Sequence, residues 1–508
     1  MRVVGLRQRL DLFRDRDLTL ATFAERLARV HGRGPLVEEH GDGGLRLTFD
    51  DAASVVARWA GALRERVAPG DRVVVALPNG YAVFLLAQAV TRAGGVAVPV
   101  NPLMRPQEIE HVVNDSASSL VVRDTTELEG AEPAESVPVD PDEVAALLYT
   151  SGTTGHPKGA ELTHRALLGR ATNAALYPSG LRHDEVVSGL PVAHIAGFSL
   201  LVQAAAFGVP VYLLRKFRPD VALDAIEHRR ATIFVGVPAM YRMMDEAGAE
   251  TRDLSSVRLW GSGADAMPYA LARRFQKLGA TARVPVWGRT VGEAAFVDGY
   301  GMVELGGGAA VKVLPPGVPL PLGGLVGLPL PGYRMRVVDD AGHDVPRGDV
   351  GELAVRGPGV MRGYHGHDDD TRRMLGEDGW LRTGDLARRG RLGLVEFAGR
   401  KKDVIKHGGY SVFAAEVESV LEEHPAVAEC AVVGLPDPRK GEVPAAAVRL
   451  RAGASVSEPD LLAWAAERLA EYKRPQRVVF VDALPRNATD KVRKVEVVAL
   501  FEDEPQST

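Results

Sequence analysis

The amino-acid sequence predicts an α/β protein with a large N-terminal domain, an antiparallel β subdomain and a small α+β domain at the C-terminus. Before about residue 323, short continuous apolar runs alternate with segments that carry apolar residues at helical spacing. Between about 323 and 397, glycine-rich turns separate short alternating runs such as YRMRVVDD and GELAVRG. The chain has 508 residues, so a single hydrophobic core is not expected.

The first strand–helix block spans residues 72–122. Its continuous apolar runs predict buried strands at RVVVAL (72–77), GVAVPV (95–100) and SLVV (119–122). Helices are expected between these strands, in YAVFLLAQAVTRAG and around Ile109, Val112 and Val113. Buried strands that alternate with helices indicate a parallel sheet with helices on both faces.

A second block repeats this pattern further along the chain. Strands are expected at VYLL (211–214), TIFVG (232–236) and VRLWG (257–261). Each precedes a helical segment: one near 219–230, one through Tyr241 and one through Phe275. Two such blocks predict two helix-covered, mostly parallel sheets in the large domain.

About the last hundred residues form a pattern of their own after the polar, glycine-containing segment GRKKDVIKHGGY. A helix (AAEVESVLEEH) is followed by a strand pair (VAECAVVGL and PAAAVRL), a second helix (DLLAWAAERLAEY) and a strand (RVVFVD). This order predicts a separate small α+β domain.

The composition excludes several classes of protein. A net charge of −5 is small for this length and argues against a protein that coats nucleic acid. The single cysteine, Cys430, excludes an intrachain disulfide and a cysteine-based metal site, and its apolar neighbours predict that it is buried. The N-terminus carries charges throughout and has no signal-peptide core, so a cytoplasmic location is expected.

One stretch needs a membrane check, because no Asp, Glu, Lys or Arg occurs between Glu185 and Arg215. Prolines, glycines and a histidine interrupt it, whereas a spanning helix needs about 20 mostly apolar residues in a row. We expect a buried helix followed by a buried strand and no transmembrane segment, with peripheral membrane contact left open.

The stretch YTSGTTGHPKGA (149–160) has the composition of a phosphate-binding loop. It follows the predicted strand VAALLY and differs from the usual nucleotide loop, which needs Gly, four residues, Gly-Lys and Ser/Thr. Backbone N–H groups and hydroxyls can wrap β- and γ-phosphates, and Lys158 can add a positive point charge. The residues expected around the phosphates are Ser151, Gly152, Thr153, Thr154 and Gly155.

This loop resembles the signature loop of the adenylate-forming superfamily, which contains acyl-CoA synthetases, nonribosomal adenylation domains and luciferases. Further blocks similar to that family follow in the same order: PVAHIAGFS (191–199), GSGADAMP (261–268), DGYGMVE (298–304), DGWLRTGD (378–385), GRKKDVIK (399–406) and PRNATDKVRK (485–494). The resemblance is closest to acyl-CoA synthetases and covers roughly residues 20–500. It implies a large ATP- and acid-binding domain (1–399), a hinge segment (400–406) and a mobile lid domain (407–508).

The resemblance implies ATP and CoA as substrates and Mg²⁺ as the metal ion. Tyr300 offers a flat face for adenine, Asp385, expected at a turn, can accept both ribose hydroxyls, and Arg400 can add a second grip. Glu304 is the expected Mg²⁺ ligand, since carboxylate oxygens suit this ion. The residues that the resemblance assigns to ATP or AMP are Thr150, Ser151, Gly152, Thr153, Thr154, Gly155, Lys158, Gly263, Asp298, Gly299, Tyr300, Val303, Asp385 and Arg400.

The catalytic group implied by the resemblance consists of Lys491, Glu304 and His194. A carboxylate and a phosphate repel each other, so an ammonium group delivered by a mobile domain would neutralise charge as they react; Lys491 fits this role. His194 would orient the substrate carboxylate, and Lys402 would be the hinge residue. The expected contacts to CoA are Lys216, Lys406, Gly408 and Gly409.

Three positions differ from the family pattern. Val303 stands where a threonine hydroxyl usually contacts the α-phosphate, and the loss of one such hydrogen bond costs about 0.5–1.5 kcal/mol. Asp490 replaces the glycine before Lys491 and could pair with that lysine. Ala414 replaces a proline, which is expected to be a local change. The segment GYHGHDDDT (363–371) matches a surface loop of the family, so no metal site is expected there.

The sequence therefore predicts an acyl-CoA synthetase that forms an acyl-AMP and then a CoA thioester. No arginine lies in GMVELGGGAAV (301–311) to meet a second carboxylate, which favours a fatty or other hydrophobic acid, with an aryl acid next. Two alternatives stay open: an acyl-AMP ligase that loads a carrier protein, and a weakly active or non-catalytic nucleotide-binding protein. No insertion after the hinge and no fused carrier domain is apparent, which favours free CoA.

Overall fold

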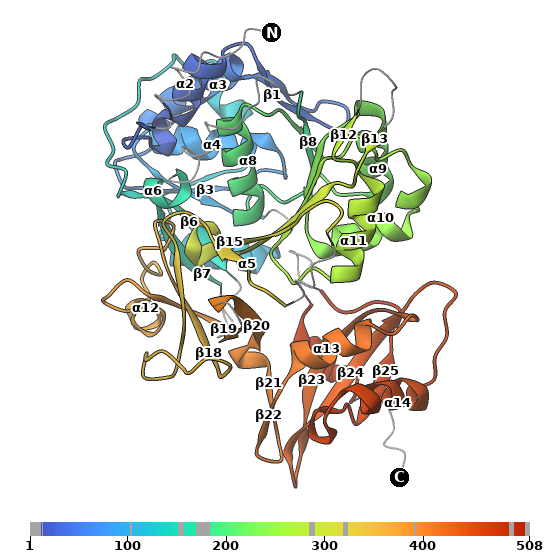
Figure 1. Cartoon of the computed structure of the whole chain (residues 1–508). Helices are drawn as coiled ribbons and strands as arrows, with labels where there is room; N and C mark the ends of the chain where they lie inside the picture. Colours follow the sequence, from blue (N-terminus) through green and yellow to red (C-terminus); the bar gives the residue numbers. More distant parts are fainter. Residues whose placement is uncertain are drawn as a thin grey trace. The chain divides into compact units, whose positions relative to one another are not determined.

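The computed structural model describes Leu12 and residues 14–101, 104–150, 157–168, 183–283, 290–318, 324–390, 393–486 and 492–502 (Figure 1). Its contacts divide the chain into two compact units. The large unit contains Met1–Gly323, Gly327–Arg334 and Arg356–Leu381. The C-terminal unit contains Gly324–Val326, Met335–Val355 and Arg382–Thr508. The predicted hinge at 400–406 stays a prediction.

The first predicted block forms a five-stranded sheet in the large unit. Its strands, in sheet order, are β5 (Leu120–Val122), β3 (Arg72–Val75), β4 (Val96–Pro99), β6 (Val144–Thr150) and β7 (Lys158–Thr163). Neighbours run parallel from β5 to β6, and β7 pairs antiparallel with β6. Val74 and Val98 of the sheet pack with Val112 of α5 (Pro106–Asp115), which explains why these strands read as continuous apolar runs.

The second block forms part of a nine-stranded sheet, as predicted. Its strands, in sheet order, are β16 (Leu328–Pro329), β15 (Gly307–Leu314), β14 (Ala295–Met302), β11 (Leu259–Gly263), β10 (Ile233–Gly236), β8 (Val186–Ser188), β9 (Val211–Leu213), β1 (Pro35–Glu39) and β2 (Arg46–Thr48). Neighbouring strands run parallel from β14 to β1, and the outer pairs β14–β15, β15–β16 and β1–β2 are antiparallel.

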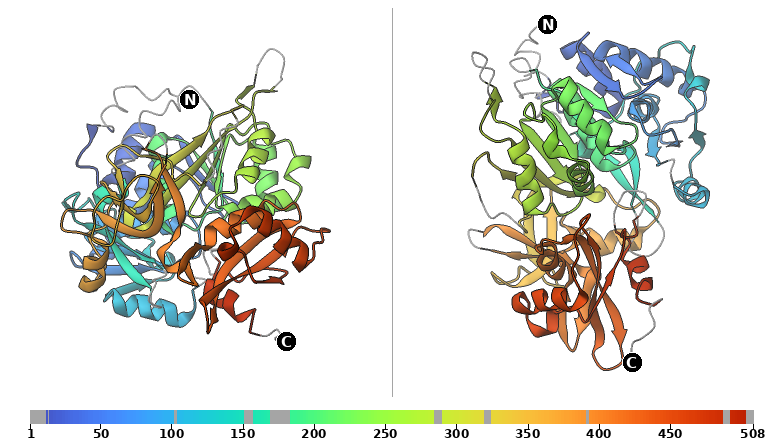
Figure 2. Two further views of the ribbon diagram at one scale, coloured as in Figure 1. Left: turned by 60° about the horizontal axis from the view of Figure 1, so that its bottom comes forward. Right: turned by 90° about the vertical axis from the view of Figure 1, so that its right-hand side faces the viewer.

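Three helices cover one face of this sheet (Figure 1, Figure 2). They are α9 (Pro219–Arg229), α10 (Pro238–Glu246) and α11 (Tyr269–Leu278). Phe234, Trp260 and Phe296 point from the sheet into this interface, where Tyr241 and Phe275 meet them edge-on or tilted. These rings, all fully buried, pack α10 and α11 against strands β10, β11 and β14.

The uncharged stretch between residues 185 and 215 folds as predicted. It forms strand β8, the buried helix α8 (Ile195–Phe207) and strand β9. Gly208 ends the helix with φ 67°, a left-handed conformation that glycine adopts without strain. In the part of the chain that the structure describes, no helix is long and apolar enough to cross a membrane.

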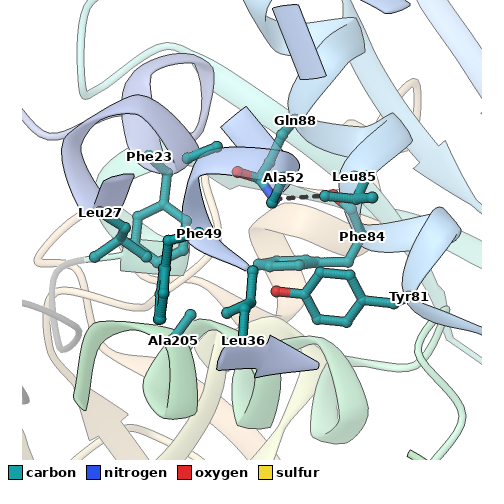
Figure 3. A pocket seen from close by; sticks show the side chains of 11 residues that line it. Phe23, Leu27, Leu36, Phe49, Ala52, Tyr81, Phe84, Leu85, Gln88 and Ala205 are labelled. Carbon is teal, nitrogen blue, oxygen red and sulfur yellow. Dashed lines mark hydrogen bonds between the residues drawn. The ribbon is translucent and has the colours of Figure 1, made fainter. Parts of the chain in front are cut away.

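Helices α2 (Leu20–His31), α3 (Phe49–Arg64) and α4 (Tyr81–Arg92) pack together at the N-terminal end of the large unit. Figure 3 shows the small cavity between them, lined by rings such as Phe23, Phe49 and Phe84 and by Ala205 of α8. Its volume is about 10 Å³, room for at most one water molecule. This cavity therefore cannot hold an acyl chain.

His164 joins this helical layer to the strand hairpin. It begins the short helix α6 (His164–Leu168), is 2% exposed, and its Nδ1 accepts a hydrogen bond from the Leu20 N–H at 3.0 Å. Burial lowers the pKa of His164 from 6.5 to about 4. As the pH falls, the unfolded chain takes up this proton first. The stability linked to His164 is therefore fully present above pH 6.5 and is lost between pH 6.5 and pH 4.

We expect His164→Asn to weaken this pH dependence, because asparagine offers the Leu20 N–H an oxygen but does not titrate. Between pH 7 and pH 5 the wild-type protein should lose about 2 kcal/mol more unfolding free energy than the variant. Urea unfolding at both pH values measures this difference. His228→Asn, on the exposed side of α9, is the control and should behave like wild type. Equal losses in wild type and His164→Asn would contradict the expectation.

The predicted antiparallel β subdomain is a four-stranded sheet that lies mostly in the C-terminal unit. Its strands, in sheet order, are β17 (Arg334–Val338), β18 (Val350–Arg356), β19 (Leu381–Arg389) and β20 (Val395–Arg400). Strands β19 and β20 form an antiparallel hairpin. At one end of this sheet, the Glu352 carboxylate accepts hydrogen bonds from Arg382 and Lys401, which anchors the segment that follows β20.

The predicted small α+β domain is a five-stranded sheet with helices on both faces. The strands are β22 (Tyr410–Phe413), β21 (Val404–His407), β24 (Gly441–Leu450) and β23 (Val427–Asp437), with β25 (Arg477–Phe480) beside β24. Cys430 and Val432 of β23 face the core with α13 (Ala414–Glu422) and α14 (Glu458–Arg468), while Ala431 and Val433 face the core with α15 (Lys494–Ala499). Cys430 is 7% exposed, as predicted, and burial raises the pKa of its thiol well above the usual value.

Short elements complete the described chain. They are β12 (Ala282–Arg283), β13 (Thr290–Val291), α12 (Asp368–Met374) and the 3-10 turns η1 (Thr126–Leu128), η3 (Ala249–Thr251), η4 (Val303–Leu305), η6 (Lys401–Asp403) and η7 (Glu471–Lys473).

Candidate active site

Thr150 and Lys158 face each other across the β6–β7 hairpin of the large unit. Thr150 is the last residue of β6, Lys158 is the first of β7, and the two are direct cross-strand partners. The hairpin register thus holds Lys158 beside the carboxyl end of strand β6. The other predicted phosphate-loop residues, Ser151, Gly152, Thr153, Thr154 and Gly155, lie outside the described residues.

Lys158 is paired with a carboxylate that the sequence did not assign to the site. Its Nζ forms an ion pair with Asp370 of α12, and the two side chains are only 12% and 20% exposed. The hydrogen bond from Lys158 lowers the pKa of Asp370, so this carboxylate is ionised at neutral pH. Lys158 Nζ also lies 5.9 Å from the centre of the Tyr364 ring.

Glu304 contacts the same tyrosine, Tyr364, through a hydrogen bond. The Tyr364 hydroxyl donates a hydrogen bond to Glu304 Oε1 at 2.7 Å, and the two residues are 7% and 5% exposed. Burial, and then the Glu304 carboxylate, raise the pKa of Tyr364, so its hydroxyl keeps its proton and remains a donor. The fold therefore brings two predicted site residues, Lys158 and Glu304, to one side chain. Val303, which replaces the usual threonine, is 7% exposed.

The segment 363–371 is more than the surface loop that the sequence predicts. Tyr364 is buried, and the ring nitrogens of His365 and His367 each lie 2.9 Å from a carboxylate oxygen, of Glu161 and Asp115 respectively. Tertiary pairing of the segment with β7 and with the end of α5 explains the difference, because a surface loop would leave these groups in water.

The carboxyl ends of β11 and β14 carry the predicted adenine-binding residues. Gly263 and Gly299 are cross-strand partners there, and Tyr300 follows in β14. A Cβ atom on Gly263 would lie 3.1 Å from the Gly299 carbonyl oxygen, so a side chain would not fit without a shift. Ligands of open α/β sheets bind beyond the carboxyl ends of the strands, and two adjacent glycines leave room there for a flat base.

Asp298 of β14 forms a buried ion pair with Lys312 of β15. Lys312 Nζ lies 3.1 Å from Asp298 Oδ2, and the side chains are 9% and 12% exposed. Burial raises the pKa of Asp298, and the charge of Lys312 opposes this shift. The second oxygen, Oδ1, is buried without a hydrogen-bond partner among the described residues. Such an acceptor suits an amino group like the exocyclic amine of adenine.

His194 is the N-cap of α8. Its Nδ1 accepts a hydrogen bond from the Ala196 N–H at 3.2 Å. With Nδ1 acting as the acceptor, the neutral ring carries its proton on Nε2, which is then the donor nitrogen of the ring. This tautomer suits the predicted role beside a carboxylate.

Asp385 and Arg400 of the C-terminal unit are direct partners across β19 and β20. Arg400 Nε lies 3.3 Å from Asp385 Oδ1. The prediction that Asp385 lies at a turn is wrong, because the residue lies inside strand β19, is 8% exposed, and donates its N–H to Thr383 Oγ1. The Thr-Gly pair before it is accommodated in the strand, where Gly384 adopts a φ of 73°.

The predicted hinge and CoA contacts lie in exposed or open positions. Lys402 lies in η6, directly after β20. Lys406 is exposed and its Nζ donates to Ser411 Oγ at 2.9 Å. Gly408 and Gly409 join β21 to β22 with φ of 57° and 87°, and a Cβ on either would meet no atom within 4 Å. Lys216, in the large unit, is exposed.

Lys491 and Asp490 lie outside the described residues, so their predicted roles stay predictions. Sequence reasoning missed Tyr364, Asp370 and Lys312. The first two belong to GYHGHDDDT, but only the tertiary fold brings them to Glu304 and Lys158. Lys312 could have been found from the sequence, since a lone lysine inside the apolar run GAAVKVL needs a buried partner charge.

Two family models match this chain. The model described as AMP-binding enzyme matches residues 23–137 and 123–365, and the one described as AMP-binding enzyme C-terminal domain matches residues 416–491. A feruloyl-CoA synthase from Amycolatopsis sp is 35% identical, covering 96% of this chain and 100% of its own. The fatty acid–[acyl-carrier-protein] ligase ScoC from Streptomyces coeruleorubidus is 33% identical, covering 89% of this chain and 91% of its own.

Among solved structures, ATP-bound MatB from Rhodopseudomonas palustris matches with a TM-score of 0.81 and 29% identity, over 96% of this chain and 99% of MatB. The chain therefore belongs to the AMP-binding enzyme family, the adenylate-forming superfamily, and is an acid–thiol ligase close to the acyl-CoA synthetases. This family membership confirms the predicted superfamily, fold class and enzyme class.

Proposed function

We propose that the protein activates a hydrophobic carboxylic acid with ATP and transfers the acyl group to CoA. The observation that carries this proposal is the arrangement of Lys158 and Glu304 around Tyr364, with a lysine for phosphate and a carboxylate for a metal ion at one side chain. Family membership supports the same reaction class, and the roles below extend it to particular residues.

In the first half-reaction, a carboxylate oxygen of the acid attacks the α-phosphorus of ATP. A new O–P bond forms, the bond from the α-phosphorus to the bridging oxygen breaks, and pyrophosphate leaves with the electron pair. Lys158 would hold the β- and γ-phosphates, and Lys491 would neutralise the carboxylate and α-phosphate as they meet. His194 would orient the carboxylate through its Nε2 proton.

Glu304 fits a magnesium ion, because its carboxylate is buried and held in place by a hydrogen bond. Mg²⁺ usually binds one or two carboxylates together with phosphates and waters, so a single glutamate is a sufficient protein ligand. When bound, the ion would neutralise phosphate charge.

The residues that would bind the adenosine moiety form two groups, one assigned to the base and one to the ribose. Gly263 and Gly299 would leave space for the base and Tyr300 would stack on it, while Asp298 Oδ1, which has no hydrogen-bond partner in the described part of the chain, would accept the exocyclic amine. Asp385 would accept the ribose hydroxyls with Arg400 beside it. Both carboxylates are paired with a cation from a neighbouring strand, Asp298 with Lys312 and Asp385 with Arg400.

In the second half-reaction, the thiolate of CoA attacks the acyl carbon. The thiol has already lost its proton to solvent, a C–S bond forms, the C–O bond to AMP breaks, and AMP leaves with the electron pair. Lys402 would act as the hinge about which the small domain turns between the two half-reactions. Before the turn the domain would present Lys491, and after it the loop with Gly408 and Gly409. Those glycines leave room for a thin pantetheine arm, and Lys216 and Lys406 are exposed cations suited to its phosphates.

Asp370 competes with the nucleotide for Lys158 in this scheme. We expect Asp370→Asn to lower the KM for ATP about two- to fivefold with little change in kcat, because asparagine keeps an acceptor for Lys158 but removes a like charge from the phosphate site. Asp369→Asn is the control, since Asp369 is 80% exposed and pairs with Arg372. The ATP dependence of pyrophosphate release measures both variants. An unchanged or raised KM for ATP in Asp370→Asn would contradict this role.

A hydrophobic acid is the proposed substrate class. The segment 301–311 is small and apolar and contains no arginine for a second carboxylate. Relatives named for a feruloyl thioester and for a fatty acid support both an aryl and a fatty acid. A carrier protein in place of CoA is the second candidate acceptor, supported by the name of ScoC.

The experiment is a screen with ATP, Mg²⁺ and either CoA or a phosphopantetheinylated carrier protein. Straight-chain acids of graded length, aryl acids and malonate are tested, and mass spectrometry detects AMP and the thioester. We expect CoA thioesters of at least one fatty or aryl acid, at rates at least about tenfold above malonate. A faster reaction with the carrier protein would reverse the choice of acceptor, and no AMP with any acid would overturn the proposed activity.

A further inference from the structure

The segment that carries Tyr364 is bound by the backbone to both sides of the predicted phosphate site. On one side, the Met361 N–H donates to the backbone carbonyl oxygen of Glu304 at 2.9 Å. On the other side, the Arg362 N–H donates to Glu161 O and the His365 N–H donates to Gly159 O, both at 2.9 Å. Tyr364 is therefore fixed relative to the strand that begins with Lys158 and to the turn that carries Glu304.

The Tyr364 hydroxyl has two possible acceptors, the Glu304 carboxylate and Met374 Sδ at 3.2 Å, and the carboxylate is the stronger because sulfur is a weak acceptor. The Tyr364 hydroxyl lies 2.7 Å from Glu304 Oε1, within the range of a strong hydrogen bond to a charged acceptor. Both residues are more than nine-tenths buried, so no bulk water replaces this donor. Thr371 Oγ1 accepts the Tyr364 N–H at 2.8 Å and holds the tyrosine backbone in turn.

We propose that Tyr364 is the positioning residue for Glu304 and sets the orientation in which this carboxylate receives the divalent cation of Mg·ATP. This inference rests on the proposed function of Glu304. A carboxylate that ligates a metal ion is usually oriented by a hydrogen bond from a neighbouring group, and loss of such a bond typically weakens metal binding 10- to 100-fold. Tyr364 makes no proton transfer and need not touch the nucleotide.

A second buried tyrosine provides a matched control. Tyr333 is 5% exposed, and its hydroxyl donates to the Leu305 carbonyl oxygen at 3.2 Å, one residue from Glu304. Tyr333→Phe removes a buried hydroxyl from the same turn but leaves the Glu304 carboxylate with its donor. Tyr364→Phe removes the hydroxyl that donates to Glu304 Oε1 and keeps the ring.

The test measures ATP binding by calorimetry to the full-length protein, once with Mg²⁺ and once with EDTA. We expect Tyr364→Phe to reduce the gain in ATP affinity that Mg²⁺ provides by about tenfold, while its affinity in EDTA stays within about twofold of wild type. Tyr333→Phe should keep the full gain. The Mg²⁺ concentration for half-maximal pyrophosphate release should rise in parallel, in Tyr364→Phe alone.

Three results would overturn the inference: an unchanged Mg²⁺-dependent gain in Tyr364→Phe, an equal loss in Tyr333→Phe, or a loss of ATP affinity that is the same with Mg²⁺ and EDTA. Failure of the proposed function is distinct from these, because it would show in the wild-type protein as a lack of ATP-dependent AMP formation. Wild-type turnover combined with an unaffected Tyr364→Phe would remove the positioning role alone.

Discussion

Replacement of Lys491 by alanine is expected to lower the rate of acyl-adenylate formation about 100- to 1000-fold. The reacting carboxylate and the α-phosphate are both anionic, and their approach builds up negative charge that the ammonium group would offset. A group that acts only in this step leaves the second half-reaction untouched. Pyrophosphate release in a single turnover measures the first step, and thioester formation from a synthetic acyl-adenylate measures the second.

The control for this prediction is Arg493→Ala, which removes a positive charge two residues away. Arg493 is 46% exposed and pairs with Glu496, so its loss should change neither half-reaction more than about twofold. If Lys491→Ala released pyrophosphate at the wild-type rate, or lost both half-reactions equally, the adenylation role would be withdrawn.

Replacement of Glu304 by glutamine is expected to lower kcat about 100-fold at saturating ATP. Glutamine keeps an oxygen that can accept the Tyr364 hydroxyl, so the buried network stays satisfied while the negative charge for the cation is lost. A bound metal ion stabilises transition-state charge by several kcal/mol, and the loss of part of this energy is enough for a 100-fold fall in kcat. The Mg²⁺ dependence of AMP formation is the measurement, and raised Mg²⁺ should restore only part of the rate.

Glu161→Gln is the matched control, because this carboxylate lies on β7 but pairs with His365 instead of Tyr364. It should keep a Mg²⁺ dependence within about twofold of wild type. A Glu304→Gln protein with normal kcat would mean that the metal ion has its ligands elsewhere in the site.

The elements that the sequence predicts well are those decided by local pattern. The runs RVVVAL, TIFVG and VRLWG are continuous because side chains on both faces of these strands are buried, and this pattern is visible in the sequence alone. The apolar strand VAECAVVGL is predicted for the same reason, since Cys430 and Ala431 face two different cores. The antiparallel subdomain follows from its glycine-rich turns.

The parts that sequence reasoning missed depend on contacts between distant segments. Tyr364 and Glu304 are 60 residues apart, and nothing in GYHGHDDDT indicates that its tyrosine turns inward while a neighbouring aspartate reaches Lys158. Asp385 was expected at a turn because Thr-Gly favours one. The pairing of β19 with β20 overrides that local preference and gives the carboxylate an arginine as its cross-strand partner.

The burial of Cys430 makes this chain convenient for spectroscopy. Its one native thiol is packed inside the small α+β domain and kept in the unreactive protonated form, so it should resist maleimide reagents in the folded state. A cysteine introduced at an exposed position such as Tyr410 would then take up a fluorophore or spin label alone. The predicted motion of this domain during turnover could then be tested without first replacing the native cysteine.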